Sequence, residues 1–306
     1  MELFKNANYP FMRWRKGYLV FSVTLCVLAI IILIGKGINY GIDFKGGSFV
    51  HVRFKEMPDM SKVRSAFVNA KELGTVEIKQ YGSKETHELM IGIQKQDEGS
   101  GATYTNKVTT LLQKEFADGF EVLRQESVGP KVGDELKWKA ILSIFLSLIA
   151  IILYIWFRFQ FRFGIASVIP LFHDVLITLG VFVAMGLEVN LPIVAAFLTL
   201  IGYSLNDTIV VFDRVRENLA KDQKSNVTDI IERSINETLS RTINTVGTVL
   251  VTLLALYFLG VSVIKDFAFA LIVGIIFGTY SSIGVASAIL ASWTPETLRR
   301  AKFKSA

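Results

Sequence analysis

Long runs of apolar residues separated by short polar connections extend over most of the chain, and 51% of the residues are hydrophobic. A helix that crosses a bilayer needs about 20 mostly apolar residues, and six segments come close to or reach that length. We therefore predict a polytopic α-helical membrane protein with six transmembrane helices, at residues 18–34, 138–157, 165–186, 191–212, 242–259 and 267–291.

Residues 35–137 separate the first predicted span from the other five, and they have the polarity pattern of a water-exposed α+β domain. The sequence SFVHVRF (48–54) alternates like a half-buried strand, and 60–73 has helical spacing. The strands TVEIKQY and HELMIGI follow, then a helix at 105–116 and a strand at 120–127. This β-α-β-β-α-β order predicts a ferredoxin-like domain.

Lys and Arg in the connections predict how the helices are oriented, because cytoplasmic loops carry an excess of both. The N-terminus (1–17), the predicted loop 213–241 and the tail 292–306 are basic, whereas the connection 187–190 has neither residue type. We therefore expect both termini in the cytoplasm and the large domain in the periplasm. The first span is followed by IGKGINYG, which lacks a small-residue cleavage pattern, so we interpret that span as an uncleaved anchor.

The net charge of +6 lies outside residues 36–137, where acidic and basic residues are equal in number. A basic excess confined to the membrane part fits topology signals better than a nucleic-acid surface, so we expect no nucleic-acid binding. The single cysteine, Cys26, excludes an intramolecular disulfide and a cysteine-based metal site. The sequence has no phosphate-binding loop and no dinucleotide-binding glycine pattern, which predicts no cofactor and no nucleotide-driven enzyme.

Asp207 lies in the fourth predicted span, within SLNDTIVVFD. A charged residue at the bilayer centre costs at least about 2.5–3.5 kcal/mol and usually faces the bundle interior, where it finds partners. Arg241 enters the fifth span at a similar depth and starts a polar helix face that continues through Thr245. Desolvation and a nearby guanidinium act on the protonation of Asp207 in opposite senses. We predict a proton relay at Asp207 and Arg241; the alternative is a static ion pair that sets helix register.

The other polar residues of the spans are weaker candidates. Asp174 follows His173 in the third span and takes either a lesser part in the relay or a part in helix packing. Because adjacent helical side chains diverge by about 100°, this pair is weak evidence for a metal, and we predict no metal site. Asn206 and Thr208 are expected to form hydrogen bonds between helices, with Thr245 in support.

The segment FDRVREN (212–218) lies at the cytoplasmic edge of the fourth span. Its charged residues are expected to mark the basic membrane border; the alternative is a cytoplasmic contact surface or a proton entrance. They are Asp213, Arg214, Arg216 and Glu217. In the sixth span, GIIFG (274–278) brings two glycines to one face, which predicts close packing against another helix or a partner chain.

Several stretches taken together resemble a known family. GIDFKGG (41–47) follows the first span, SVGPKVGDEL (127–136) precedes the second, HDV lies in the third, GYSLNDTIVVFDRVREN covers the fourth and SRTINT opens the fifth. With six spans and one large outer loop, the chain closely resembles the SecF family of the bacterial Sec translocon, in the resistance–nodulation–division superfamily. The resemblance covers almost the whole chain, and its long fourth-span motif is highly specific.

The resemblance implies a subunit that pairs with SecD and assists SecYEG, with YajC and YidC as further partners. It implies that the proton-motive force, with protons as the coupling ion, aids late export of unfolded polypeptides across the bacterial inner membrane. The family's membrane Asp and fifth-span Arg correspond to Asp207 and Arg241, and its glycine motif to Gly41, Asp43, Gly46 and Gly47. Such transporters have two similar halves, so a separate SecD is expected. An exporter of small hydrophobic molecules and a passive translocon scaffold are the alternatives.

Overall fold

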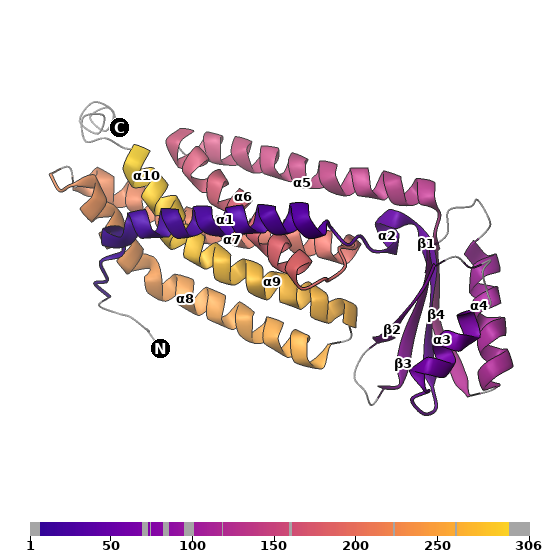
Figure 1. Ribbon diagram of the computed structural model, residues 1–306. Coiled ribbons are helices and arrows are strands. Elements are labelled where there is room, and N and C mark those ends of the chain that lie inside the picture. Colours follow the sequence, from indigo (N-terminus) through magenta and orange to yellow (C-terminus); the bar gives the residue numbers. More distant parts are fainter. Residues whose placement is uncertain are drawn as a thin grey trace.

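The computed structural model describes residues 7–68, 73, 75–81, 86–94, 101–117, 119–158, 161–222, 224–260 and 262–293. It has two parts, a long helical bundle and an α/β domain at one end of that bundle (Figure 1). The bundle holds the apolar segments and the α/β domain holds the region between the first two of them. The two polarity patterns in the sequence therefore correspond to two separate parts of the structure.

The described residues include six helical segments that are long and apolar enough to cross a membrane, which confirms the predicted number of spans. They are α1 (Arg15–Lys36), which follows the short 3-10 helix η1 (Phe11–Trp14), α5 (Pro130–Arg158), α6 (Phe161–Ala184), α7 (Leu191–Lys221), α8 (Val227–Leu259), and a last segment made of α9 (Ser262–Tyr280), the π-helix η4 (Ser281–Ala286) and α10 (Ser287–Trp293). Helix α1 begins and α10 ends at the end of the bundle that is farther from the α/β domain (Figure 1).

Three helical segments form the inside of the bundle and three lie outside. Each span contains an apolar stretch of 18 residues. In α6, α7 and the α9–α10 segment, 56% of that stretch is buried inside the protein, whereas in α1, α5 and α8 only 11% is buried. Large apolar side chains such as Ile34, Phe157 and Leu259 are exposed on the outer helices. Lipid tails are as apolar as these side chains, so the exposed faces suit a bilayer or a partner bundle.

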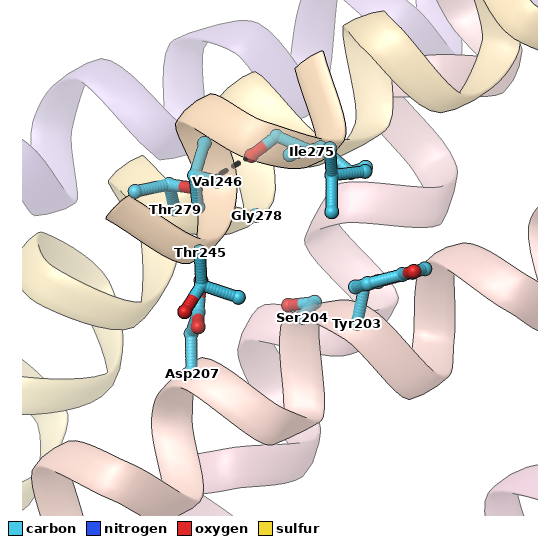
Figure 2. Close-up of a pocket in the computed structure, with 9 residues that line it drawn as sticks. Tyr203, Ser204, Asp207, Thr245, Val246, Ile275, Gly278 and Thr279 are labelled. Atoms are coloured by element: carbon cyan, nitrogen blue, oxygen red, sulfur yellow. Dashed lines mark hydrogen bonds between the residues drawn. The ribbon is translucent and has the colours of Figure 1, made fainter. Parts of the chain in front are cut away.

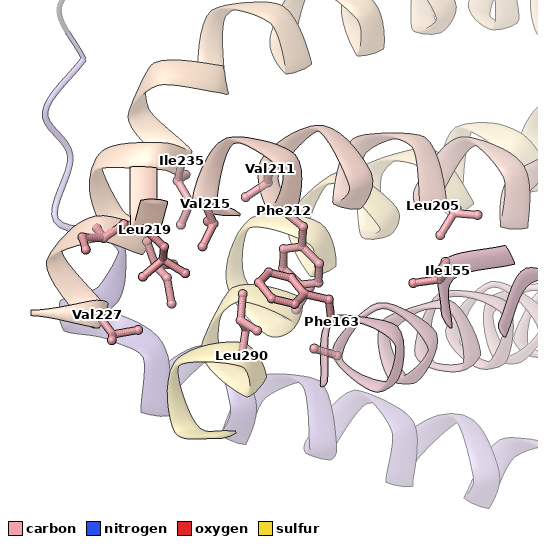
Figure 3. Close-up of a cluster of buried hydrophobic side chains, with 14 of the residues drawn as sticks. Ile155, Phe163, Leu205, Val211, Phe212, Val215, Leu219, Val227, Ile235 and Leu290 are labelled. Atoms are coloured by element: carbon pink, nitrogen blue, oxygen red, sulfur yellow. The ribbon is translucent and has the colours of Figure 1, made fainter. Parts of the chain in front are cut away.

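Two apolar clusters fill the bundle. The cluster farther from the α/β domain contains Phe163 and Phe212, whose rings meet edge to face with centroids 5.5 Å apart (Figure 3). The other cluster includes Phe197 and Leu200 of α7 together with Phe44, which precedes the α/β domain. Buried polar residues also lie in the bundle, among them Asp174 of α6, Asp207 of α7 and Ser281 of η4, and α8 carries others such as Thr242.

The prediction of a loop at 213–241 was wrong. Helix α7 continues to Lys221 and α8 begins at Val227, so only a short turn connects them. The apolar run ends near Phe212, but the helices continue beyond it because Val215 and other apolar residues of their ends are buried against one another. Asn226 accepts a hydrogen bond from the Thr228 amide (3.1 Å) and so caps α8. Hydropathy predicts the membrane-embedded length of a helix and not its whole length.

The α/β domain has the predicted order of elements. These are β1 (Gly47–Phe54), α3 (Met60–Val68), β2 (Thr75–Tyr81), β3 (Glu88–Gln94), α4 (Gly101–Phe116) and β4 (Phe120–Val128). The strands pair antiparallel in the order β2-β3-β1-β4. Helices α3 and α4 cover the face of the sheet that is turned away from the bundle (Figure 1). Alternate residues of β1, Val50 and Val52, pack there in one core with Leu112 of α4.

Candidate functional site

Asp207 lies inside the bundle, on the face of α7 that meets α8 and α9, and only 7% of its surface is exposed. It lines a cavity of about 10 Å³, about the room that one water molecule needs. The other polar walls are Ser204, Thr245 and Thr279, and Figure 2 shows Asp207 pointing toward Thr245 of α8. Within the described residues, no side chain donates a hydrogen bond to the Asp207 carboxylate. This carboxylate therefore faces a small cavity with polar and apolar walls, and no described residue is a fixed donor to it.

Arg241 does not form the predicted direct pair with Asp207 in this structure. Across the described ranges, no ion pair within 4.0 Å joins the two residues, although Arg241 acts on Asp207 electrostatically. The Arg241 side chain is exposed, and Thr245, one turn further along α8, lines the cavity in its place. The static ion pair considered as an alternative is therefore not formed here.

Asp174 of α6 is the centre of a buried hydrogen-bond network and is fully buried. Its Oδ2 accepts a hydrogen bond from Ser204 of α7 (2.5 Å) and another from Ser281 of η4 (2.9 Å). Its Oδ1 lies 2.9 Å from Nδ1 of the neighbouring His173. The expected divergence of these two side chains is overcome because the imidazole turns back toward the carboxylate. Asp174 thus connects α6, α7 and η4. The sequence analysis treated it only as a weaker candidate and did not predict these contacts.

The supporting residues Thr208 and Asn206 differ in position. Thr208 is fully buried, and its hydroxyl lies 2.8 Å from the hydroxyl of Ser282. This contact is the predicted hydrogen bond between helices. Asn206 is exposed on another face of α7, so it takes no part in the network inside the bundle.

The last helical segment widens into the π-helix η4 where it meets this network. Two consecutive serines are both fully buried there, Ser281 toward Asp174 and Ser282 toward Thr208. π-helical turns inside α-helices are frequent at functional sites. Before η4, Gly278 allows a close approach, because a Cβ on it would lie 3.1 Å from Ser204 Cβ and 3.5 Å from Asp174 Oδ2. The predicted glycine face therefore packs against the polar network of the same chain.

The glycine motif connects the bundle to the α/β domain. Gly41 donates its backbone N–H to Val189 (2.8 Å), and Asp43, in the short helix α2 (Ile42–Lys45), accepts a hydrogen bond from the Leu191 amide at the start of α7 (2.9 Å). Gly46 and Gly47 have φ of 72° and 143°, and a Cβ on Gly47 would lie 2.5 Å from the Ile93 carbonyl. Only glycine suits this conformation and this space. The motif thus binds the first residues of the helix that carries Asp207.

Comparison with known families now identifies the chain. Residues 107–296 match the model described as protein export membrane protein SecD/SecF, C-terminal, and residues 31–55 match the SecD/SecF GG motif. The protein translocase subunit SecF of Desulfurispirillum indicum is 45% identical over 94% of this chain and 92% of its own length. The chain belongs to the SecD/SecF family. It is a multi-pass membrane protein, and its relatives are named translocase subunits.

Two further relatives support the same family. The protein translocase subunit SecF of Vibrio alginolyticus is 45% identical over 91% of this chain and 88% of its own length. A crystal structure of SecDF from Thermus thermophilus, described as a translocon-associated membrane protein, has 37% identity and a TM-score of 0.84 over 96% of this chain. The chain spans 39% of that SecDF chain. The fold of a SecD/SecF membrane protein, predicted from the sequence, is therefore shown.

The charged residues at the end of α7 divide into two groups in this SecD/SecF family member. Arg214 donates to Glu217 (2.6 Å) and to Glu237 of α8 (2.6 Å), so it ties the two helices together beyond their apolar parts. Asp213 and Arg216 are exposed. Arg214 and Glu217 thus have a structural part at this edge, and the structure adds Glu237, which the sequence did not single out.

Sequence reasoning missed the residues that surround the two carboxylates. Ser204, Ser281 and Ser282 are uncharged residues of apolar spans, and the sequence did not single them out as partners of a carboxylate. The available signal was the run TYSS (279–282), four small or hydroxylated residues in the middle of a span. In the described ranges, no group of three or more His, Cys, Asp or Glu residues is arranged to hold a metal ion.

Proposed function

We propose that this chain is the SecF-like half of a SecDF complex that uses the proton-motive force to assist late protein translocation through SecYEG. The observation that carries the proposal is the position of Asp207, which lies in the bundle beside a cavity and has no fixed hydrogen-bond donor among the described residues. An intramembrane carboxyl group of this kind is expected to serve an ion or proton pathway. Protons are then the only coupling ion, and no nucleotide is needed.

The outer surface of α8 supports a partner bundle as the second half of the pathway. Arg241, Thr248 and Thr252 are exposed there, in a helix whose surroundings would otherwise be lipid. Exposed polar residues in a span are unfavourable next to hydrocarbon and favourable against another helix. SecD is the proposed neighbour, with twelve spans in the complete transporter. SecYEG, YajC and YidC are proposed to lie further out.

The proposed location is the bacterial inner membrane, with both termini and the turn between α7 and α8 in the cytoplasm. The basic ends of the chain support this orientation. The α/β domain then lies in the periplasm, where an exported polypeptide emerges. Its open sheet face borders a cavity of about 320 Å³ near Asn190 and offers apolar contacts such as Phe49 and Met90. Its edge strands β2 and β4 offer backbone groups to an extended chain.

The proposed mechanism couples protonation of Asp207 to movement of α7. Neutralising the carboxylate weakens its attraction to Arg241, and the change in charge shifts the balance between two arrangements of the SecF and SecD bundles. One proton that crosses about 100 mV supplies about 2.3 kcal/mol, enough to shift such a balance. Asp43 holds the first residue of α7, so this helix is a direct route to the α/β domain and the polypeptide it contacts.

The test uses membrane vesicles that contain this chain, SecD and SecYEG, with a preprotein whose late translocation is followed after ATP is removed. Asp207→Asn is expected to abolish stimulation by the proton-motive force, and Arg241→Met to reduce it strongly. The matched control is Asp229→Asn, which removes an exposed carboxylate of α8 and should leave stimulation at its normal level. Unchanged stimulation in both site variants, at normal protein levels, contradicts the relay and favours a passive scaffold.

An exporter of small hydrophobic molecules remains the other alternative. Such a protein needs a substrate tunnel through the membrane part, whereas the cavity beside Asp207 has a volume of about 10 Å³. Asp207→Asn also distinguishes an exporter of small molecules from a protein-export subunit. Loss of resistance to a hydrophobic solute in Asp207→Asn cells, with protein export unaffected, favours the exporter.

A further inference from the structure

Ser204 belongs to both polar centres of the bundle. Its hydroxyl donates to Asp174 Oδ2 at 2.5 Å, and the same residue lines the cavity of Asp207. Ser204 is 4% exposed, so both contacts are sheltered from the surroundings of the bundle. Figure 2 shows it on α7 one turn before Asp207, on the side of the cavity. A single hydroxyl therefore separates the Asp207 cavity from the buried Asp174.

The cavity suits one water molecule. Its volume of about 10 Å³ and its polar walls, Asp207, Ser204, Thr245 and Thr279, meet the two needs of a buried water. The wall between the cavity and Asp174 is thin, since the Cβ position of Gly278 is only 3.5 Å from Asp174 Oδ2. A water molecule in this cavity would lie beside both Asp207 and Ser204, and Ser204 already bonds to Asp174.

The far side of Asp174 offers a further place for a proton. His173 Nδ1 contacts Asp174, whereas His173 Nε2 is buried and has no hydrogen-bond partner among the described residues. Buried polar atoms without a partner are rare in folded proteins and call for an explanation. A side chain that gains and loses a proton is one such explanation, because an imidazole nitrogen serves as acceptor or donor.

We propose that Ser204 relays a proton between the Asp207 cavity and the Asp174–His173 pair, so that the proton path has a branch on the α6 side of α7. This proposal rests on the proposed function, in which Asp207 takes up and releases a proton. In the transfer, the Asp207 carboxyl gives its proton to the cavity water. That water gives a proton to Ser204 Oγ as Ser204 passes its own hydroxyl proton to Asp174 Oδ2. The hydroxyl and the water are restored, and one proton has moved.

Other ionisable groups surround this path. Arg241 of α8 acts on Asp207, and Cys26 of α1 interacts electrostatically with Asp174. The Tyr280 ring lies 6.3 Å from the His173 ring, and its hydroxyl bonds to Ser22 (3.0 Å) and to the Tyr18 carbonyl (2.8 Å). None of these groups both bonds to Asp174 and lines the Asp207 cavity, as Ser204 does.

The test follows the carbonyl stretch of protonated carboxyl groups by infrared difference spectroscopy after a step to lower pH. The sample is the full chain with SecD in lipid vesicles. The band that Asp174→Asn removes is assigned to Asp174. Ser204→Ala is expected to slow the growth of this band by at least about tenfold, since a positioned proton-transfer group contributes about 10²–10⁴-fold. Ser204→Cys, which keeps a donor of similar size, is expected to restore part of the rate.

Ser281→Ala is the matched control. It also removes one hydrogen bond to Asp174 Oδ2, but Ser281 does not line the Asp207 cavity, so the band should grow much faster than in Ser204→Ala. Equal slowing by both alanines assigns Ser204 a structural part only and overturns the relay. The relay is also overturned if no Asp174 band forms at any pH, or if Ser204→Ala leaves the rate unchanged. Gly278→Ala, whose methyl group enters the same wall, repeats the test if Ser204→Ala does not fold.

Failure of this relay and failure of the proposed function give different results. If Asp207→Asn leaves stimulation by the proton-motive force intact, the proposed function fails whatever Ser204 does. If Asp207→Asn abolishes stimulation while the Asp174 band forms at the normal rate in Ser204→Ala, the relay alone fails.

Discussion

The two carboxylates inside the bundle have opposite surroundings. Asp174 is fully buried and accepts hydrogen bonds from Ser204 and Ser281, with His173 beside its other oxygen. Asp207, one turn beyond Ser204 on α7, faces a small cavity with polar and apolar walls and receives no hydrogen bond from any described residue. A carboxylate held by three groups stabilises the packing of the helices that supply them. A carboxylate without fixed donors changes its protonation with little loss of structure.

The difference in hydrogen bonding between Asp174 and Asp207 shows that two carboxylates in membrane spans can have very different surroundings. Both residues are in the apolar part of the chain, and both would be costly without compensation. Their neighbours decide the outcome, and most of those neighbours are uncharged serines, threonines and glycines.

Replacing each carboxylate by leucine tests this difference most strongly. Asp174→Leu removes the partner of three buried groups, the hydroxyls of Ser204 and Ser281 and Nδ1 of His173. Hydrogen bonds inside a membrane protein are worth about 0.6–1 kcal/mol each, so we expect a loss of about 2–3 kcal/mol. Asp207→Leu breaks no hydrogen bond with a described residue, and its stability should be equal or higher. Thermal unfolding in detergent micelles measures both. Equal destabilisation by the two variants would show that Asp174 does not stabilise the helix packing more than Asp207 does.

Gly278→Ala is expected to have the next largest effect, because it places a methyl group between the two centres. The new Cβ would lie 3.1 Å from Ser204 Cβ, and such overpacking typically costs about 1–3 kcal/mol. Gly202→Ala is the matched control, since a Cβ at this exposed glycine of α7 meets nothing within 4 Å. The control should be neutral or slightly stabilising, because alanine favours a helix. Unfolding midpoints that change equally would contradict the close approach.

Asp43→Ala tests whether the glycine motif couples the α/β domain to the site helix. It removes the acceptor of the Leu191 amide, with an expected cost of about 0.5–1 kcal/mol, as for the loss of a helix cap. In Asp43→Ala, the distribution of distances between spin labels on α4 and α8 should be broader than in the unchanged protein. Asn190→Ala removes the cap that α7 forms with its own Asn190 (3.2 Å to Ile193 N) and should leave that distribution narrow. Identical distributions in the two variants would show that Asp43 is only a cap.

Asp222 in the turn between α7 and α8 gives the smallest effect and a carboxylate outside the membrane for comparison. Hydrogen bonds from the Ser225 side chain and amide lower its pKa to about 2. A lowered pKa in the folded state means that Asp222 stabilises the turn above its unfolded pKa of about 3.9 and that this stabilisation is lost as pH falls through about 2. Asp222→Ala should speed hydrogen exchange of the Ser225 amide at neutral pH. Below about pH 2 Asp222 is protonated, so the substitution should no longer speed exchange of the Ser225 amide. An equally large effect of Asp222→Ala below about pH 2 would contradict the lowered pKa of Asp222.

Much of the architecture was predictable from local patterns. The six apolar runs predicted six membrane helices because hydrocarbon requires apolar side chains and internal hydrogen bonds over a fixed length. The alternation of residues 48–54 predicted β1 because one face of a sheet is buried and the other is not. The ends of α7 and α8 were not predicted, because there the helix is supported by contacts between Val215, Leu219 and their partners on the other helix.

The sequence alone determined the family, the six spans, the order of elements in the α/β domain and the place of Asp207 within a span, since each depends on residues close together in the chain. Only the tertiary structure decided which residues surround the two carboxylates. It moved Arg241 out of direct contact with Asp207 and made Asp174 the better bonded of the two carboxylates. It also placed Ser204 between them. Ser204 and Ser281 are far apart in sequence, and their common position at Asp174 arises from the packing of α6, α7 and η4, which no local pattern records.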